Sequence, residues 1–165
     1  MKKLIVAMLV VGLASVASAG LALDVFVDGA PYADNVSAGS VVTLNFKDTV
    51  GGALMGGFGA VNIGIDQGTF TSVTAHPGTL GNGFTGAADG AGFAVTGDMT
   101  YMFTPAPADN VVLSIVFEAT GTPIEVAVAG GYNAADISGL STTLVPEPMT
   151  LGLLGLGGLF LRRRK

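Results

Sequence analysis

The sequence predicts an all-β fold, an antiparallel β-sandwich, for the middle of this 165-residue chain. Apolar and polar residues alternate there over short runs, which is the period-two pattern of strands with one buried face. These runs are rich in β-branched and aromatic residues, and clusters of Gly, Pro, Asn and Asp separate them. No uninterrupted stretch of ten or more residues in the middle carries a helical apolar stripe.

Six runs are expected to form strands, one after another along the chain. They lie at residues 21–27, 42–46, 61–65, 100–103, 111–117 and 124–128. The run 111–117 is almost continuously apolar, so we expect it in the centre of a sheet. Two Gly-rich segments, 51–60 and 78–92, are expected to be long loops or edge excursions. Regular short strands of this kind pack as two antiparallel sheets around one core.

The strand pattern is similar to that of cohesin-like and other immunoglobulin-like bacterial surface domains. That resemblance rests on the pattern alone, because no diagnostic motif accompanies it.

Positive charge is concentrated at the two ends of the chain. Residues 20–145 hold eleven Asp and Glu residues against the single Lys47, which is a net charge of −10. Nucleic-acid binding needs a basic surface, so we expect no nucleic-acid partner. The chain contains no Cys, which excludes disulfides, thiolate catalysis and Cys-ligated metal centres.

Residues 1–19 have the three parts of a secretory signal peptide. Two lysines precede an apolar run at 4–13, and Ala17 and Ala19 supply the small residues that signal peptidase requires. We therefore expect the export machinery and signal peptidase to act on this chain, with cleavage between Ala19 and Gly20. The mature protein then begins at Gly20, outside the cytoplasm.

Residues 145–165 form a second targeting device. A proline-rich motif leads into a Gly- and Leu-rich apolar run, and four basic residues follow it. The motif is Val145, Pro146, Glu147, Pro148 and Thr150, and the basic tail is Arg162, Arg163, Arg164 and Lys165. The uncharged stretch 149–161 falls short of the ~20 residues of a full bilayer crossing. We expect a short transmembrane helix whose basic end stays cytoplasmic, so that the acidic middle lies outside.

This tail resembles the PEP-CTERM sorting signal of Gram-negative, exopolysaccharide-producing bacteria. The resemblance covers residues 145–165 and rests on the order of motif, apolar helix and basic cluster. It implies that an exosortase, a membrane-embedded cysteine-protease-like enzyme, recognises Pro146-Glu147-Pro148. It also implies that the tail is removed or exchanged and that the protein reaches the cell surface or extracellular matrix. The expected organisation is a signal peptide at 1–19, a β-sandwich at 20–144 and a sorting signal at 145–165.

The middle of the chain offers few groups for catalysis, and we expect no enzyme. His76 is the single histidine, and no nucleophile motif surrounds any Ser that would complete a triad with Asp66 or Asp89. Lys47 is expected to form a solvated pair with the adjacent Asp48. Most of the aspartates lie beside Gly or Asn at turns, where their side chains accept hydrogen bonds from nearby backbone N–H groups.

Two kinds of ligand remain open. Calcium takes oxygen ligands from loops, although the chain has no EF-hand or dockerin-type motif. The best candidates for calcium ligands are Asp24, Asp28, Asp89 and Asp98. Tyr32 and Tyr132 lie beside turns and are candidates for stacking on a sugar, but they fit equally well as half-buried residues at strand ends. No other cofactor is expected.

Three function classes stay open at this point. The favoured one is a non-catalytic surface or matrix protein, with structural, adhesive or exopolysaccharide-associated work. The second is a carbohydrate- or protein-binding module, which a concave face carrying Tyr32 or Tyr132 would favour. The third is a secreted hydrolase, which would show a pocket holding two carboxylates or His76 bonded to an Asp.

Overall fold

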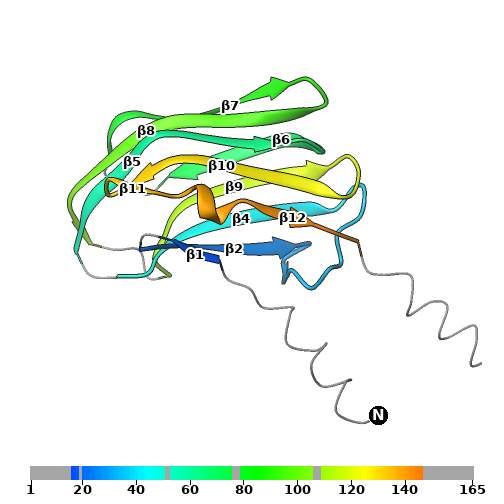
Figure 1. The fold of residues 1–165 in the computed structure, drawn as a ribbon, viewed down its shortest axis with the longest axis horizontal. Coiled ribbons are helices and arrows are strands. Elements are labelled where there is room, and N and C mark those ends of the chain that lie inside the picture. Colours follow the sequence, from blue (N-terminus) through cyan, green and yellow to red (C-terminus); the bar gives the residue numbers. More distant parts are fainter. Residues whose placement is uncertain (1–15, 19, 51–52, 76–78, 106–108, 147–165) are drawn as a thin grey trace, which may run out of the picture.

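Two antiparallel β-sheets pack against each other in the computed structural model of this protein (Figure 1). The structure describes residues 16–18, 20–50, 53–75, 79–105 and 109–146. The predicted all-β class and two-sheet architecture are confirmed. In the view of Figure 1, β7 and β8 lie at the top and β1 and β2 at the bottom.

The first sheet, called sheet A, has the strand order β1-β2-β4-β9-β6, with β3 paired to part of β2. Its strands are β1 (Val16–Ser18), β2 (Leu21–Val27), β3 (Ala30–Pro31), β4 (Val41–Asp48), β6 (Gly68–Ala75) and β9 (Val111–Ala119). The predicted central run 111–117 lies in β9, which pairs with β4 on one side and β6 on the other.

The second sheet, called sheet B, has the order β11-β10-β5-β8-β7, with β12 paired to part of β10. Its strands are β5 (Ala53–Ile65), β7 (Thr79–Asp89), β8 (Gly92–Pro105), β10 (Ile124–Tyr132), β11 (Ala135–Asp136) and β12 (Thr142–Leu144). A single turn of 3₁₀ helix, η1 (Ser138–Leu140), joins β11 to β12.

The core lies between the sheets because each strand turns alternate residues inward. On β4 the fully buried side chains are Val42, Leu44 and Phe46. Facing them, β10 and its neighbours contribute the other half of the core. Aromatic rings connect the layers: Phe93 on β8 lies 5.5 Å from Phe117 on β9, measured between ring centroids.

The two Gly-rich segments were expected to be long loops or edge excursions. The loop prediction is wrong for both, because both form strands, and the second segment forms β7 at the edge of sheet B. Residues 53–60 belong to β5, and residues 79–89 form β7; both strands pair with β8. Glycine is required here by close packing. A Cβ on Gly86 would lie 2.5 Å from the ring of Phe70, and one on Gly97 would lie 2.1 Å from the backbone oxygen of Gly83. The backbone ladder holds these strands although their side chains are small.

Three strands of sheet B carry β-bulges. The register shifts between Phe58 and Val61 on β5, between Leu80 and Gly83 on β7, and between Ala129 and Gly131 on β10. A bulge bends its strand and increases the local twist. Gly130 has φ +115°, and a Cβ there would approach the backbone oxygen of Ala60 to 2.7 Å.

The expected signal peptide and the expected C-terminal helix fall mainly on residues 1–15 and 147–165, which lie outside the described part of the chain. The end of the expected signal peptide, Val16–Ser18, forms strand β1, antiparallel to β2. Gly20, with φ +79°, lies in the turn that joins them. Within the described ranges no helix has both the length and the apolar character needed to cross a membrane.

Candidate functional site

Val145, which follows strand β12, lies beside the side chain of Tyr32. Tyr32 follows β3, and its N–H donates to the carbonyl of Val25 on β2 (2.9 Å), so its backbone is fixed to sheet A. Its ring is half-buried and packs against the core. Its hydroxyl accepts a hydrogen bond from the N–H of Val145 (2.7 Å) and donates one to the carbonyl of the same residue (3.3 Å). Tyr32 therefore connects sheet A to the residue that follows the last strand of sheet B.

The expected sorting motif begins where this contact is made. Strand β12 pairs with β10 through Leu144, which is fully buried, and Val145 and Pro146 then emerge exposed. Proline has no N–H, so the ladder cannot continue past Val145. The remaining residues of the expected tail fall outside the described ones: Glu147, Pro148, Thr150, Arg162, Arg163, Arg164 and Lys165.

The Tyr32 hydroxyl stays protonated at neutral pH. Burial raises the pKa of Tyr32; the hydrogen bond from the Val145 backbone acts in the opposite direction, and the nearby Asp34 carboxylate raises the pKa further. A neutral hydroxyl can accept and donate at the same time, as the contact with Val145 requires. Tyr32 is thus a hydrogen-bonding residue of the chain's own fold.

A second polar contact between the sheets is buried. The Tyr132 hydroxyl, at the end of β10, donates to Oδ2 of Asp48 at the end of β4. Both residues are almost fully buried, at 1% and 4% exposure. Asp48 also accepts the N–H of Val50 (2.7 Å). Tyr132 is therefore a structural residue and is not available to a surface ligand.

Removing the Tyr132 hydroxyl is expected to destabilise the fold. Tyr132→Phe keeps the ring but deprives a buried carboxylate of a donor, which we expect to cost about 1–3 kcal/mol of unfolding free energy. Urea denaturation of the purified domain measures this. The matched control is Tyr32→Phe, because its hydroxyl bonds lie at the exposed edge and their loss should cost less. If Tyr132→Phe loses no more unfolding free energy than Tyr32→Phe, the buried pair of Tyr132 and Asp48 is not important for stability.

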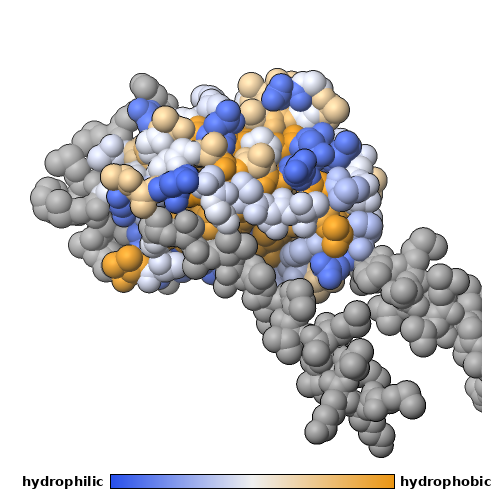
Figure 2. All heavy atoms as spheres, in the orientation of Figure 1, coloured by the Kyte–Doolittle hydropathy of each residue, from blue (hydrophilic) through white to orange (hydrophobic). Residues whose placement is uncertain are grey.

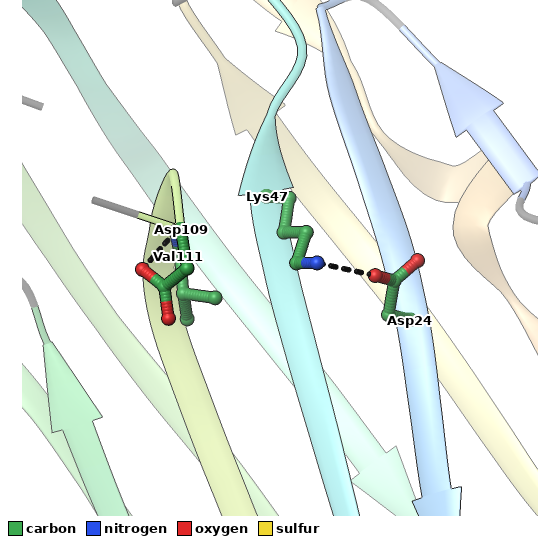
Figure 3. A network of polar contacts seen from close by, with 4 residues as sticks. All are labelled: Asp24, Lys47, Asp109 and Val111. Carbon is green, nitrogen blue, oxygen red and sulfur yellow. Dashed lines mark hydrogen bonds and ion pairs between the residues drawn. The ribbon is translucent and has the colours of Figure 1, made fainter. Parts of the chain in front are cut away.

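Lys47 does not pair with Asp48, contrary to the prediction. Its Nζ lies 2.7 Å from Oδ2 of Asp24 on the neighbouring strand β2 (Figure 3). Consecutive strand residues point to opposite faces, so Lys47 faces outward while Asp48 faces the core. Figure 3 also shows Asp109 turned toward the backbone at the start of β9, where its Oδ1 accepts the N–H of Val111 (3.2 Å).

The four calcium candidates are divided between the two sheets. Asp24 and Asp28 belong to β2 and the turn after it, and Asp89 and Asp98 belong to β7 and β8. Asp24 is paired with Lys47, and Asp28 accepts the N–H of Val41 (2.8 Å). Among the residues that the structure describes, no three His, Cys, Asp or Glu side chains gather in a way that would hold a metal ion.

The residues considered for catalysis also have separate places. Oδ1 of Asp66 accepts the N–H of Glu125 (2.7 Å), which joins the β5–β6 turn to β10. Asp89 is exposed at the tight turn between β7 and β8. His76 lies outside the described residues. At the edge of sheet B, Asp136 accepts hydrogen bonds from the backbone N–H and the hydroxyl of Ser138, which lower the pKa of its carboxyl.

The outer face of sheet B carries a shallow open hollow of about 540 Å³. It lies beside the bulges of β5 and β7, and its polar side chains are Thr85, Thr96 and Asp98. One carboxylate lines it within the described residues, whereas a glycosidase pair needs two. Figure 2 shows hydrophilic residues interspersed with weakly and strongly hydrophobic ones over the visible face of the molecule. The hollow was not expected from the sequence, because the bulges that shape it lie in segments read as loops.

No protein-family model matches this chain, and no curated protein matches its sequence.

Proposed function

We propose that this protein is an exported, non-catalytic β-sandwich that an exosortase sorts to the cell surface or the extracellular matrix. The observation that carries the proposal is the coincidence of two boundaries. The last described strand, β12, ends at Leu144, and the Pro-Glu-Pro motif begins two residues later at Pro146. A sorting enzyme that acts on this motif would therefore separate the tail from the sandwich without cutting through β12.

The two ends of the chain would act at different stages of export. The N-terminal signal would bring the chain to the export machinery and signal peptidase, and the apolar run at 149–161 with its basic end would hold the precursor at the inner membrane. The acidic sandwich would then lie on the far side, within reach of an exosortase. Loss or exchange of the tail would pass the domain to the surface or matrix.

The structural roles of the acidic residues support a non-catalytic domain. Asp28, Asp66 and Asp109 accept backbone hydrogen bonds, Asp24 is paired with Lys47, and Asp48 is buried against Tyr132. A general acid or base must reach a substrate and carry a suitable pKa. Side chains that hold turns and strand ends in place are poor candidates for that work.

The charge of the domain supports a role in a hydrated matrix. A net charge of −10 over residues 20–145 keeps copies of the protein apart and discourages direct binding to polyanions. Among the described residues, the exposed large hydrophobic side chains are Val41, Val50 and Val145, which belong to three separate segments of the chain. Such a surface suits neutral exopolysaccharide, or acidic exopolysaccharide joined through divalent cations. We also propose that the sandwich has a cohesin-like or immunoglobulin-like topology.

The hollow on sheet B favours a second candidate function, a carbohydrate-binding module. Threonine hydroxyls and carboxylates form hydrogen bonds with sugar hydroxyls. The hollow is lined by two such hydroxyls, of Thr85 and Thr96, and by the carboxylate of Asp98. Thr85→Val and Thr96→Val keep the size of these side chains and remove their hydroxyls. Weaker retention of the double variant on an exopolysaccharide column, at unchanged stability, would favour this alternative.

The proposal is tested on protein isolated from the surface or medium of the producing cell. We expect it there, and we expect no turnover on a panel of glycoside, ester and peptide substrates. Single alanine variants of His76, Asp66 and Asp89 serve as controls for any activity observed. Turnover by the wild type that one of these changes abolishes would refute the non-catalytic domain. Protein found only in the cytoplasm would refute export.

A further inference from the structure

We infer that Tyr32 is a positioning residue for C-terminal processing: its hydroxyl holds Val145 against the sandwich and restricts access to the chain from Val145 onward. The contact joins residues 113 positions apart, so it exists only in the folded domain. The inference rests on the proposed sorting for the identity of the processing enzyme, but the contact itself does not depend on that enzyme.

The hydroxyl holds both polar backbone atoms of one residue. It accepts from the N–H of Val145 (2.7 Å) and donates to its carbonyl (3.3 Å), which together satisfy the hydrogen-bonding groups that a neighbouring strand would satisfy. The ring is fixed at its base, because the Tyr32 N–H bonds to Val25 and the ring packs on the core. At Val145, the Tyr32 hydroxyl therefore takes the place of a neighbouring strand.

The position of this contact is set by the sequence around it. Strand β12 pairs with β10 at Thr142, Thr143 and Leu144 and no further. Pro146 has no N–H to donate, so Val145 carries the last backbone donor before the motif. The Val145 backbone forms its hydrogen bonds with the Tyr32 hydroxyl, so Tyr32 fixes this residue beyond the end of the ladder. With this contact, the motif begins at a fixed point on the surface.

A processing enzyme competes with Tyr32 for Val145. Enzymes and domains that bind extended peptides pair with the backbone N–H and C=O groups of the bound segment. At Val145 these are the two groups that the Tyr32 hydroxyl occupies. An enzyme whose groove includes Val145 must therefore wait until the contact opens, and Tyr32 slows processing until it does.

The first test is made on the purified full-length chain and needs no sorting enzyme. Tyr32→Phe keeps the ring and removes both hydrogen bonds, so we expect the Val145 amide to exchange with solvent roughly 3- to 10-fold faster. Cleavage of the tail by added proteinase K should accelerate by a similar factor. Thr69→Val is the matched control, since it removes a hydroxyl from an exposed side chain on β6 and should leave both the fold and the Val145 amide unchanged. Equal exchange at Val145 in wild type and Tyr32→Phe would overturn the inference.

The second test follows processing in the producing cell. We expect tail removal from Tyr32→Phe to be several-fold faster than from wild type, with Thr69→Val processed at the wild-type rate. If Val145 is released in Tyr32→Phe but tail removal keeps its rate, Tyr32 has no positioning role. Failure of the proposed sorting has a different signature: a variant with Pro146, Glu147 and Pro148 changed to Ala would lose its tail normally, while the exchange difference at Val145 would persist.

Discussion

Replacing Pro146, Glu147 and Pro148 by alanine is expected to leave the protein in the inner membrane with residues 162–165 still attached. The variant keeps the apolar run and the basic end that anchor the precursor, and it loses the motif that the sorting enzyme is proposed to read. The sandwich itself should fold normally, because strand β12 ends at Leu144 and the Tyr32 contact uses Val145. The expected effect is a nearly complete block of release.

Cell fractionation with an antibody against the sandwich measures this block. Glu118→Ala is the matched control for the loss of one negative charge, because Glu118 is an exposed glutamate on β9 and far from the tail in sequence. The control should be released like the wild type. If the triple alanine variant reaches the surface in the same amount as the control, the exosortase proposal is wrong.

Phe117→Ala is expected to remove about 3–5 kcal/mol of unfolding free energy, which is a large part of the ~5–15 kcal/mol of a typical domain. Phe117 is fully buried on the central strand β9, and its ring contacts that of Phe93 across the core. Its ring also fills the space beside Gly68, where a Cβ would lie 2.7 Å from it. Alanine would leave a cavity between the two sheets.

Urea denaturation of the domain gives the free-energy difference. Val41→Ala, at the start of β4, is a suitable control, because this side chain is 47% exposed and its truncation should cost far less. A loss below about 1 kcal/mol for Phe117→Ala would mean that the two sheets do not share the core described here.

The strands with alternating apolar residues could be predicted from the sequence. The pattern Val42, Leu44, Phe46 places one face of β4 in the core, and continuing it by one step would also have placed Asp48 there. Instead, Lys47 was expected to pair with its sequence neighbour. The period-two geometry separates these two side chains, and Lys47 pairs across strands with Asp24.

Other features depend on contacts that local sequence does not contain. The run 61–65 was predicted as a strand, but the first part of β5 and strand β7 were not, because glycine, which weakens a strand signal, is needed there for close approach of Phe70 and of neighbouring backbone. The Tyr32–Val145 contact joins two distant residues with no shared motif. The motif at residues 145–148 is visible in the sequence. Only the fold shows that Tyr32 holds Val145, the first residue of that motif.

The central claim is that the domain is freed at both ends on its way to the surface. The intact mass of wild-type protein recovered from the surface or medium tests this most directly. We predict a chain that begins at Gly20 and lacks residues 162–165, with its C-terminus at or near Pro146-Glu147-Pro148, with or without an added group. A recovered chain whose mass still includes Met1 or Lys165 would contradict the account.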